Sequence, residues 1–202
     1  MTPRNEVLAT ALLACAYWGP CLLAAEGTDS KASEIQGIFD ADQSDRDFGP
    51  NLTASQEQWK KITERDEARR KRVRQILDEG GLTTGKDYRQ AAFVFQHGSL
   101  PADYLLAHLQ AMVGVSKGDM ESRWIAAAAL DRYLQAVKQP QVFGTQYFKK
   151  DPLSSWVQEP YDRALFPDML RKEFCVPGVS QQGNALAAMN RNEKPDLPVI
   201  CH

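Results

Sequence analysis

Polar side chains of the kinds used in catalysis and binding lie between residues 96 and 146. An imidazole titrates near neutral pH, so His97 could serve as a general acid or base, and a carboxylate such as Asp131 could orient its ring. Arg132 could bind a carboxylate or phosphate through its planar guanidinium. The catalytic candidates are therefore His97, Asp131 and Arg132, and the ligand-binding candidates are Gln96, Gln141, Thr145 and Gln146.

The same side chains also fit a structural role. A histidine at a helix end often caps the last carbonyl groups. An adjacent pair such as Asp131 and Arg132, on a helix that faces a polar loop, commonly fixes that loop in place. Both interpretations stay open from the sequence alone.

No metal site and no cofactor is predicted. A metal site needs three or more suitable ligands, whereas a helix break separates His97 from His108, and His202 is the last residue. The sequence also lacks the motifs of serine nucleophiles, phosphate-binding loops and dinucleotide-binding folds. Any chemistry would therefore rest on the side chains named above.

Helical spacing of apolar residues predicts the elements that position these side chains. A long helix begins at Thr53 or Ser55 and ends at Gly80-Gly81, and three further helices cover about 87–97, 99–118 and 119–139. Short glycine-containing turns join them, so neighbouring helices should be antiparallel. The predicted fold is mainly α, built of antiparallel helical hairpins like those of helical-repeat proteins.

The pattern changes after Pro140. Pairs of apolar residues at 142–143, 147–148 and 156–157 flank a turn signal at 150–152, which predicts a small β-hairpin or an extended flap against the helices. A short helix is expected around Met169 and Leu170, and another between 181 and 190. Residues 53–202 should form a single domain.

The N-terminal segment 1–25 is predicted to be a signal peptide. A head carrying Arg4 precedes an apolar run at 7–16, and small residues follow for cleavage. Gly19-Pro20 interrupts the run before the ~20 residues that span a bilayer, so no stable membrane span should remain after processing. We expect an exported bacterial protein, periplasmic or extracellular. Lipid attachment at Cys15 is the weaker alternative.

Residues 26–52 are acidic and contain few apolar side chains, which predicts a flexible linker. Of the four cysteines, Cys175 and Cys201 lie outside the signal segment and would form one disulfide in an oxidising compartment. The net charge is −2, and acidic residues at i,i+4 spacing accompany the basic run in 60–74. Nucleic acid is therefore not an expected partner.

Three segments, 91–98, 123–134 and 140–147, resemble an uncharacterised family of exported bacterial helical proteins. The shared signature is Gln-His, then Leu-Asp-Arg, then Gly-Thr-Gln, and the likeness covers roughly 66–147. The family implies no activity. It adds weight to these residues: Gln96, His97, Asp131, Arg132, Gln141, Gly144, Thr145 and Gln146.

The sequence favours a binding or interaction domain with a polar pocket around His97 and 141–146. Its partner would be a peptide, a protein or a small polar molecule. One alternative is a hydrolase or transferase that uses His97 as general acid or base. The other is a structural protein of the cell envelope.

Overall fold

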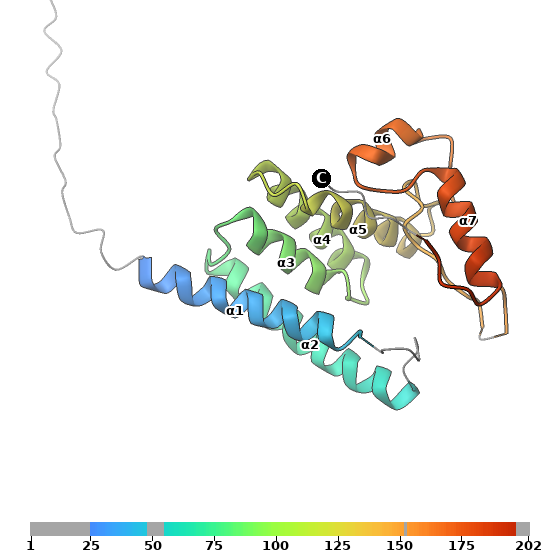
Figure 1. Cartoon of the computed structure of the whole chain (residues 1–202). Coiled ribbons are helices and arrows are strands. Elements are labelled where there is room, and N and C mark those ends of the chain that lie inside the picture. The colour runs from blue at the N-terminus through green and yellow to red at the C-terminus, as the bar shows by residue number, and fades with distance from the viewer. Residues whose placement is uncertain (1–24, 48–54, 152, 197–202) are drawn as a thin grey trace, which may run out of the picture.

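The computed structural model describes residues 25–47, 55–151 and 153–196, and in these ranges the chain is helical without any β-strand. This confirms the predicted mainly α fold. The helices are α1 (Ala25–Ser44), α2 (Gln56–Asp78), α3 (Gly85–Phe95), α4 (Pro101–Ser116), α5 (Ser122–Ala136), α6 (Asp168–Glu173) and α7 (Val179–Asn190). Figure 1 shows α1 and α2 at one end of the molecule, α6 and α7 at the other, and α3 to α5 between them.

The prediction of a flexible linker at 26–52 was wrong for the part that the structure describes, because α1 begins at Ala25 and continues to Ser44. Ile35 is fully buried against Val73 and Ile76 of α2. Acidic side chains of this segment pair with arginines of α2, as Glu34 does with Arg72. The composition of the segment was misleading for two reasons. Its few apolar residues are concentrated on one face of the helix, and its charges are neutralised by a helix that is distant in the sequence.

α2 begins and ends where the sequence predicted. The hydroxyl of Ser55 accepts a hydrogen bond from the backbone N–H of Gln58, and the Gln58 side chain accepts one from the N–H of Ser55. This reciprocal cap satisfies two N–H groups that have no partner within the helix. At the other end, the N–H of Gly81 donates to the carbonyl of Ile76.

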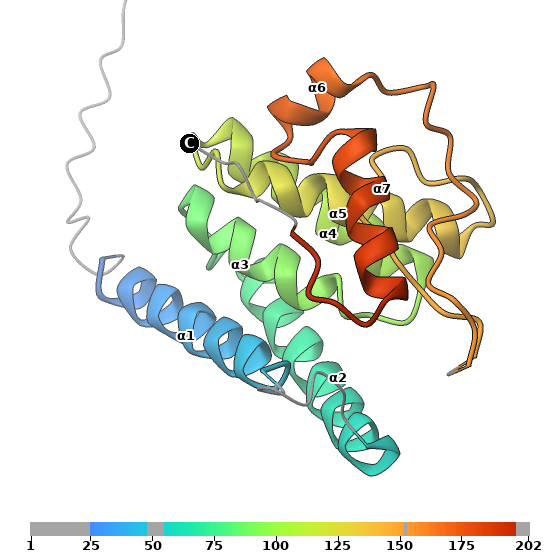
Figure 2. The ribbon, with the colours of Figure 1, turned by 45° about the vertical axis from the view of Figure 1, so that its right-hand side comes forward.

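α3, α4 and α5 pack consecutively and form the centre of the molecule (Figure 2). α3 begins slightly before its predicted start at about residue 87, because Thr84 caps it and Asp87 completes the reciprocal pair from inside the helix. Small buried side chains let the helices approach closely, among them Ala92, Ala111 and Ala126.

We call residues 138–158 the flap. It makes two isolated β-bridges, one between Gln141 and Tyr161 and one between Phe148 and Val157. Of the two alternatives raised by the sequence, the extended segment describes it better than a regular hairpin. α6 and α7 match the two predicted short helices. A separate apolar cluster joins the segments that flank α6 to α5, with Phe143 and Val176 buried against Ala127.

None of the helices in the described part of the chain is long and apolar enough to cross a membrane. The predicted signal segment falls on residues 1–25, nearly all of which lie outside the described residues.

Candidate functional site

Asp131 fixes the first half of the flap to α5. One of its carboxylate oxygens accepts hydrogen bonds from the N–H groups of Val142 (2.8 Å) and Phe143 (3.0 Å). The other accepts from the N–H (2.9 Å) and the hydroxyl (2.8 Å) of Thr145. Asp131 is fully buried, so its charge is stabilised by the loop it holds.

Gln141 closes the same loop from within. Its side-chain oxygen accepts from the N–H of Gln146, and its NH₂ group donates to the carbonyls of Gln146 and Gln158. Gln141 is fully buried and all of its polar atoms have partners. Asp131, Gln141 and Thr145 therefore hold the flap in place through hydrogen bonds within the protein.

The C-terminal part of the chain supplies the partners of the flap carbonyls. Arg171, fully buried, donates to the carbonyls of Val142 (2.7 Å) and Phe143 (2.8 Å). The NH₂ group of Gln182 also donates to the carbonyl of Phe143. Gly144 has a φ of 81°, and a Cβ there would collide with Gln182 and Tyr161. The Gly-Thr-Gln segment is thus a tightly packed structural loop around one glycine.

His97 is paired with Asp42 and not with Asp131. Its Nδ1 lies 3.0 Å from Oδ1 of Asp42, a fully buried residue near the end of α1. The carboxylate that orients the imidazole therefore comes from the segment that the sequence analysis interpreted as a linker. Asp42 lies two residues before the end of α1, a helix that the sequence analysis did not predict.

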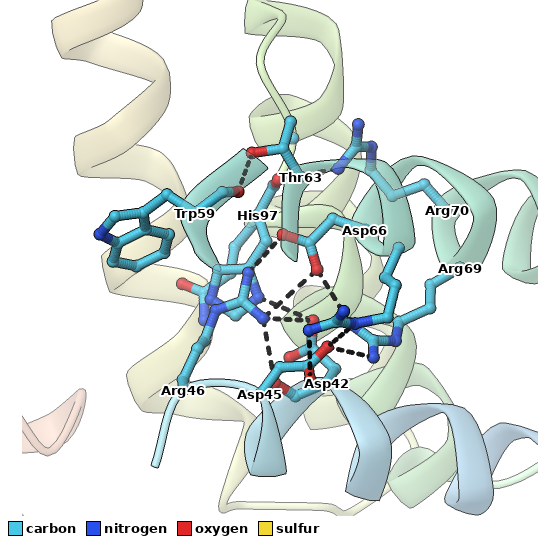
Figure 3. A network of polar contacts seen from close by, with 12 residues as sticks. Asp42, Asp45, Arg46, Trp59, Thr63, Asp66, Arg69, Arg70 and His97 are labelled. Atoms are coloured by element: carbon cyan, nitrogen blue, oxygen red, sulfur yellow. Dashed lines mark hydrogen bonds and ion pairs between the residues drawn. The ribbon is translucent and has the colours of Figure 1, made fainter. Parts of the chain in front are cut away.

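The pair belongs to a network of charges between α1, α2 and the turn after α3 (Figure 3). Arg46 donates to both Asp42 and Asp66, and Arg69 pairs with Asp66 and Asp45. Asp45 also accepts two hydrogen bonds from Arg65. Three carboxylates thus face three guanidinium groups, so the network is balanced when His97 is neutral. The carboxylates and guanidinium groups of this network therefore already have partners within the protein.

Burial is the main cause of the lowered pKa of His97. Asp42 opposes this shift, while the positive charges of Arg46 and Arg132 add to it. The imidazole is therefore kept in its neutral form near neutral pH.

Arg132 differs from the other arginines of this region. Its guanidinium makes one hydrogen bond, from Nη1 to the carbonyl oxygen of Gln96 at 3.3 Å, and it has no ion pair with a carboxylate of the described residues. Its Nε is shielded from solvent and has no partner. Burial lowers its pKa, and the nearby charge of Arg46 contributes. A positive charge is thus held in the fold without compensation.

Arg132 lines two neighbouring pockets. The first, which we call the His97 pocket, is also lined by Arg46, Asp66 and His97 and has a volume of about 450 Å³. The second lies between α4, α5 and the flap and has a volume of about 440 Å³. We call it the flap pocket. Its lining residues are Tyr104, Arg132, Gln135, Ala136, Gln146, Tyr147 and Phe148.

The flap pocket concentrates polar groups without partners. Among the described residues, six buried side-chain nitrogen or oxygen atoms lack a hydrogen bond. Three of them belong to this lining: Nε of Arg132, Nε2 of Gln135 and the hydroxyl of Tyr147. All three can donate hydrogen bonds. Buried polar groups are normally paired, so the presence of three unpaired donors among the lining residues of one pocket makes this pocket a candidate ligand site.

The structure brings together part of the predicted site. His97 and Arg132 share the His97 pocket, while Arg132 and Gln146 share the flap pocket. The side chain of Gln96 is buried, and its carbonyl accepts the bond from Arg132. Sequence reasoning missed Asp42, Gln135 and Tyr147. Of these, Gln135 had a usable signal, because it lies three positions after Arg132 and hence on the same helix face.

Cys175 is buried, at a left-handed backbone position with a φ of 57°. Its predicted disulfide partner, Cys201, lies outside the described residues, so the disulfide stays a prediction. No cluster of three or more possible metal ligands occurs within residues 25–47, 55–151 and 153–196.

The chain was compared with protein-family models, with curated proteins and with solved structures, and no match was found. The resemblance to an uncharacterised exported family therefore stays a prediction that rests on its quoted segments.

Proposed function

We propose that this protein is a binding domain whose site is centred on Arg132, where the His97 pocket and the flap pocket meet. The ligand would be a small polar molecule or a polar part of a peptide or protein. The observation that carries the proposal is the guanidinium of Arg132, which is largely buried and has one hydrogen bond and no carboxylate partner.

A charge in this position does not help the fold. Moving a cation out of water costs free energy that an ion pair or several hydrogen bonds must offset. Every arginine of the adjacent network has such a partner, as Arg46 has Asp42 and Asp66. Arg132 lacks such a partner. A ligand that supplies an acceptor group would therefore gain the free energy of an ion pair with its guanidinium.

The test compares the melting temperatures of an Arg132→Met variant and the parent protein. Methionine keeps the apolar stem of the side chain and removes the charge. We expect the melting temperature to stay equal or to rise by roughly 2–4 °C, which corresponds to about 1 kcal/mol in a chain of this size.

The matched comparison is Asp131→Asn on the same helix. It should lower the melting temperature by several degrees, because an amide cannot accept all four of the hydrogen bonds that Asp131 receives. If Arg132→Met is as destabilising as Asp131→Asn, Arg132 holds the fold together and the proposed binding role is wrong.

A second candidate function is hydrolysis or group transfer with His97 as general acid or base. It is favoured by the bond between His97 and Asp42, since a ring whose Nδ1–H donates to a carboxylate leaves Nε2 as the basic nitrogen. His97 lines a pocket that Arg132 also lines. Hydrolysis of chromogenic esters that disappears in His97→Gln, a variant that should still fold, would favour the enzyme.

We also propose that the protein is exported after removal of a signal segment near residue 25. The proposal is supported by the apolar run at 7–16 and its flanking small residues. Mass spectrometry of the native protein should find a mature N-terminus after this segment. An intact Met1 on protein from the cytoplasm would contradict it.

A further inference from the structure

The lining of the flap pocket carries one positive charge, and its buried side-chain atoms without a hydrogen-bond partner are all donors. Arg132, Gln135 and Tyr147 each place an unpartnered donor atom in its lining residues. No residue that the structure describes in this lining carries a carboxylate. A ligand that complements the pocket must therefore bring acceptor oxygens and a negative charge.

The protonation states agree with this assignment. Burial raises the pKa of Tyr147 to about 12, so its hydroxyl keeps its proton and acts as a donor at neutral pH. The amide of Gln135 donates without carrying charge, and a guanidinium stays protonated in proteins. The total charge offered to the ligand is therefore that of a single cation.

The charge balance favours a carboxylate over a phosphate. A carboxylate carries one negative charge and has two oxygens that can accept several hydrogen bonds. A phosphate monoester carries about −1.5 to −2 charges at neutral pH. Arg46, whose charge acts on Arg132, is already bound to Asp42 and Asp66. The positive charge of Arg46 is therefore already neutralised and would not stabilise a second negative charge on the ligand.

We propose that the flap pocket is a carboxylate-binding site, in which Arg132 supplies the charge and Gln135 and Tyr147 supply neutral hydrogen bonds. This inference rests on the proposed function and specifies its ligand class. The donor atoms are shielded in the empty pocket. Binding therefore requires rotamer changes of Gln135 and Tyr147 that turn these atoms toward the ligand.

The experiment is a titration of the full mature chain with sodium acetate, followed by the side-chain N–H signals of arginine and glutamine in nitrogen-15 NMR spectra. Sodium chloride at the same ionic strength is the reference, and sodium phosphate is the second arm. The Arg132→Gln and Gln135→Leu variants identify the two signals. We expect saturable shifts of both with acetate and none with chloride.

Melting temperatures give an independent measurement. At about five times its dissociation constant, acetate should raise the melting temperature of the parent by roughly 2–4 °C over the chloride reference. The increase should vanish in Arg132→Gln and shrink in Tyr147→Phe. The matched control is Arg123→Gln, also on α5, because Arg123 lies outside the pocket lining and its Nε donates to the carbonyl of Met120. It should respond as the parent does.

The carboxylate assignment is overturned by saturable binding of phosphate alone, by no saturable shift with either anion, or by an acetate response that persists in Arg132→Gln. The wider proposal fails by a different result, a large loss of stability in Arg132→Met. A stable Arg132→Met variant together with no anion response would reject the ligand class and leave the binding role standing.

Discussion

The Nδ1 atom of His97 lies 3.0 Å from Oδ1 of Asp42, although 55 positions separate the two residues in the chain. Arg46 binds the same oxygen, also at 3.0 Å. One buried carboxylate thus connects α1 with the turn after α3 and sets the direction of the imidazole. The predicted orienter, Asp131, is instead occupied by the flap.

The first prediction is that stability falls as the pH drops below about 6.5, the usual pKa of histidine. Burial lowers the pKa of His97 in the folded protein, so an unfolded chain binds a proton in this range before the folded chain does. The stabilising effect is complete above that pH and is lost as the pH falls toward the lowered value.

Melting temperatures at pH 7.5 and 5.5 check this prediction, with His97→Gln beside the parent. The variant should lose less stability over this interval. Asp45 acts at more acidic pH, because its hydrogen bond with Arg65 holds its pKa below the usual 3.8. An equal pH dependence in both proteins would contradict the assignment to His97.

The second prediction concerns the docking of α1. Ile35→Ala should reduce the free energy of unfolding by about 2–5 kcal/mol, because it removes most of a fully buried side chain from the interface with α2. Chemical denaturation measures the change. The exposed neighbour Ser33 supplies the control Ser33→Ala, which should have little effect. Equal stability in both variants would mean that α1 does not pack as described.

The third prediction concerns Gly144. A Gly144→Ala variant should be less stable by about 3 kcal/mol or more, because alanine disfavours a φ of 81° and its Cβ has no room beside Gln182 and Tyr161. Gly118 has a similar φ of 88° but open space around it. Gly118→Ala should therefore cost only the backbone strain, about 1 kcal/mol. Thermal unfolding of the pair separates crowding from strain.

The fourth prediction concerns Arg171. Arg171→Met should destabilise the protein by about 3 kcal/mol, because the carbonyls of Val142 and Phe143 lose a charged donor inside the protein. Lys172→Met at the next, exposed position serves as the control and should change stability little. Denaturant unfolding curves provide the measurement. A mild effect of Arg171→Met would show that the flap carbonyls find other partners.

The helices were predictable because their signals are local. The cap formed by Ser55 and Gln58, the proline at the start of α4 and the glycines between helices all act within a few residues. The sequence analysis missed α1 because this helix is held by contacts with the distant α2, namely the burial of Ile35 and ion pairs such as Glu34 with Arg72. No pattern within 26–47 reveals a partner 38 positions away.

The candidate site was only partly predictable for the same reason. The choice of Arg132 and Gln146 rested on residue type, and both line the flap pocket. The roles of Asp131 and Gln141 depend on which backbone groups face them in the folded chain, which the sequence does not reveal. Tyr147 stands out only once burial leaves its hydroxyl without a partner.

The flap has a consequence for the order in which the chain can fold during synthesis. α3, α4 and α5 contact one another directly and can associate as soon as residue 136 is available. The carbonyls of Val142 and Phe143 have partners on Arg171 and Gln182. Until those residues leave the ribosome, the loop that walls the flap pocket lacks its support. The proposed binding site is therefore completed last, when nearly the whole chain has been made.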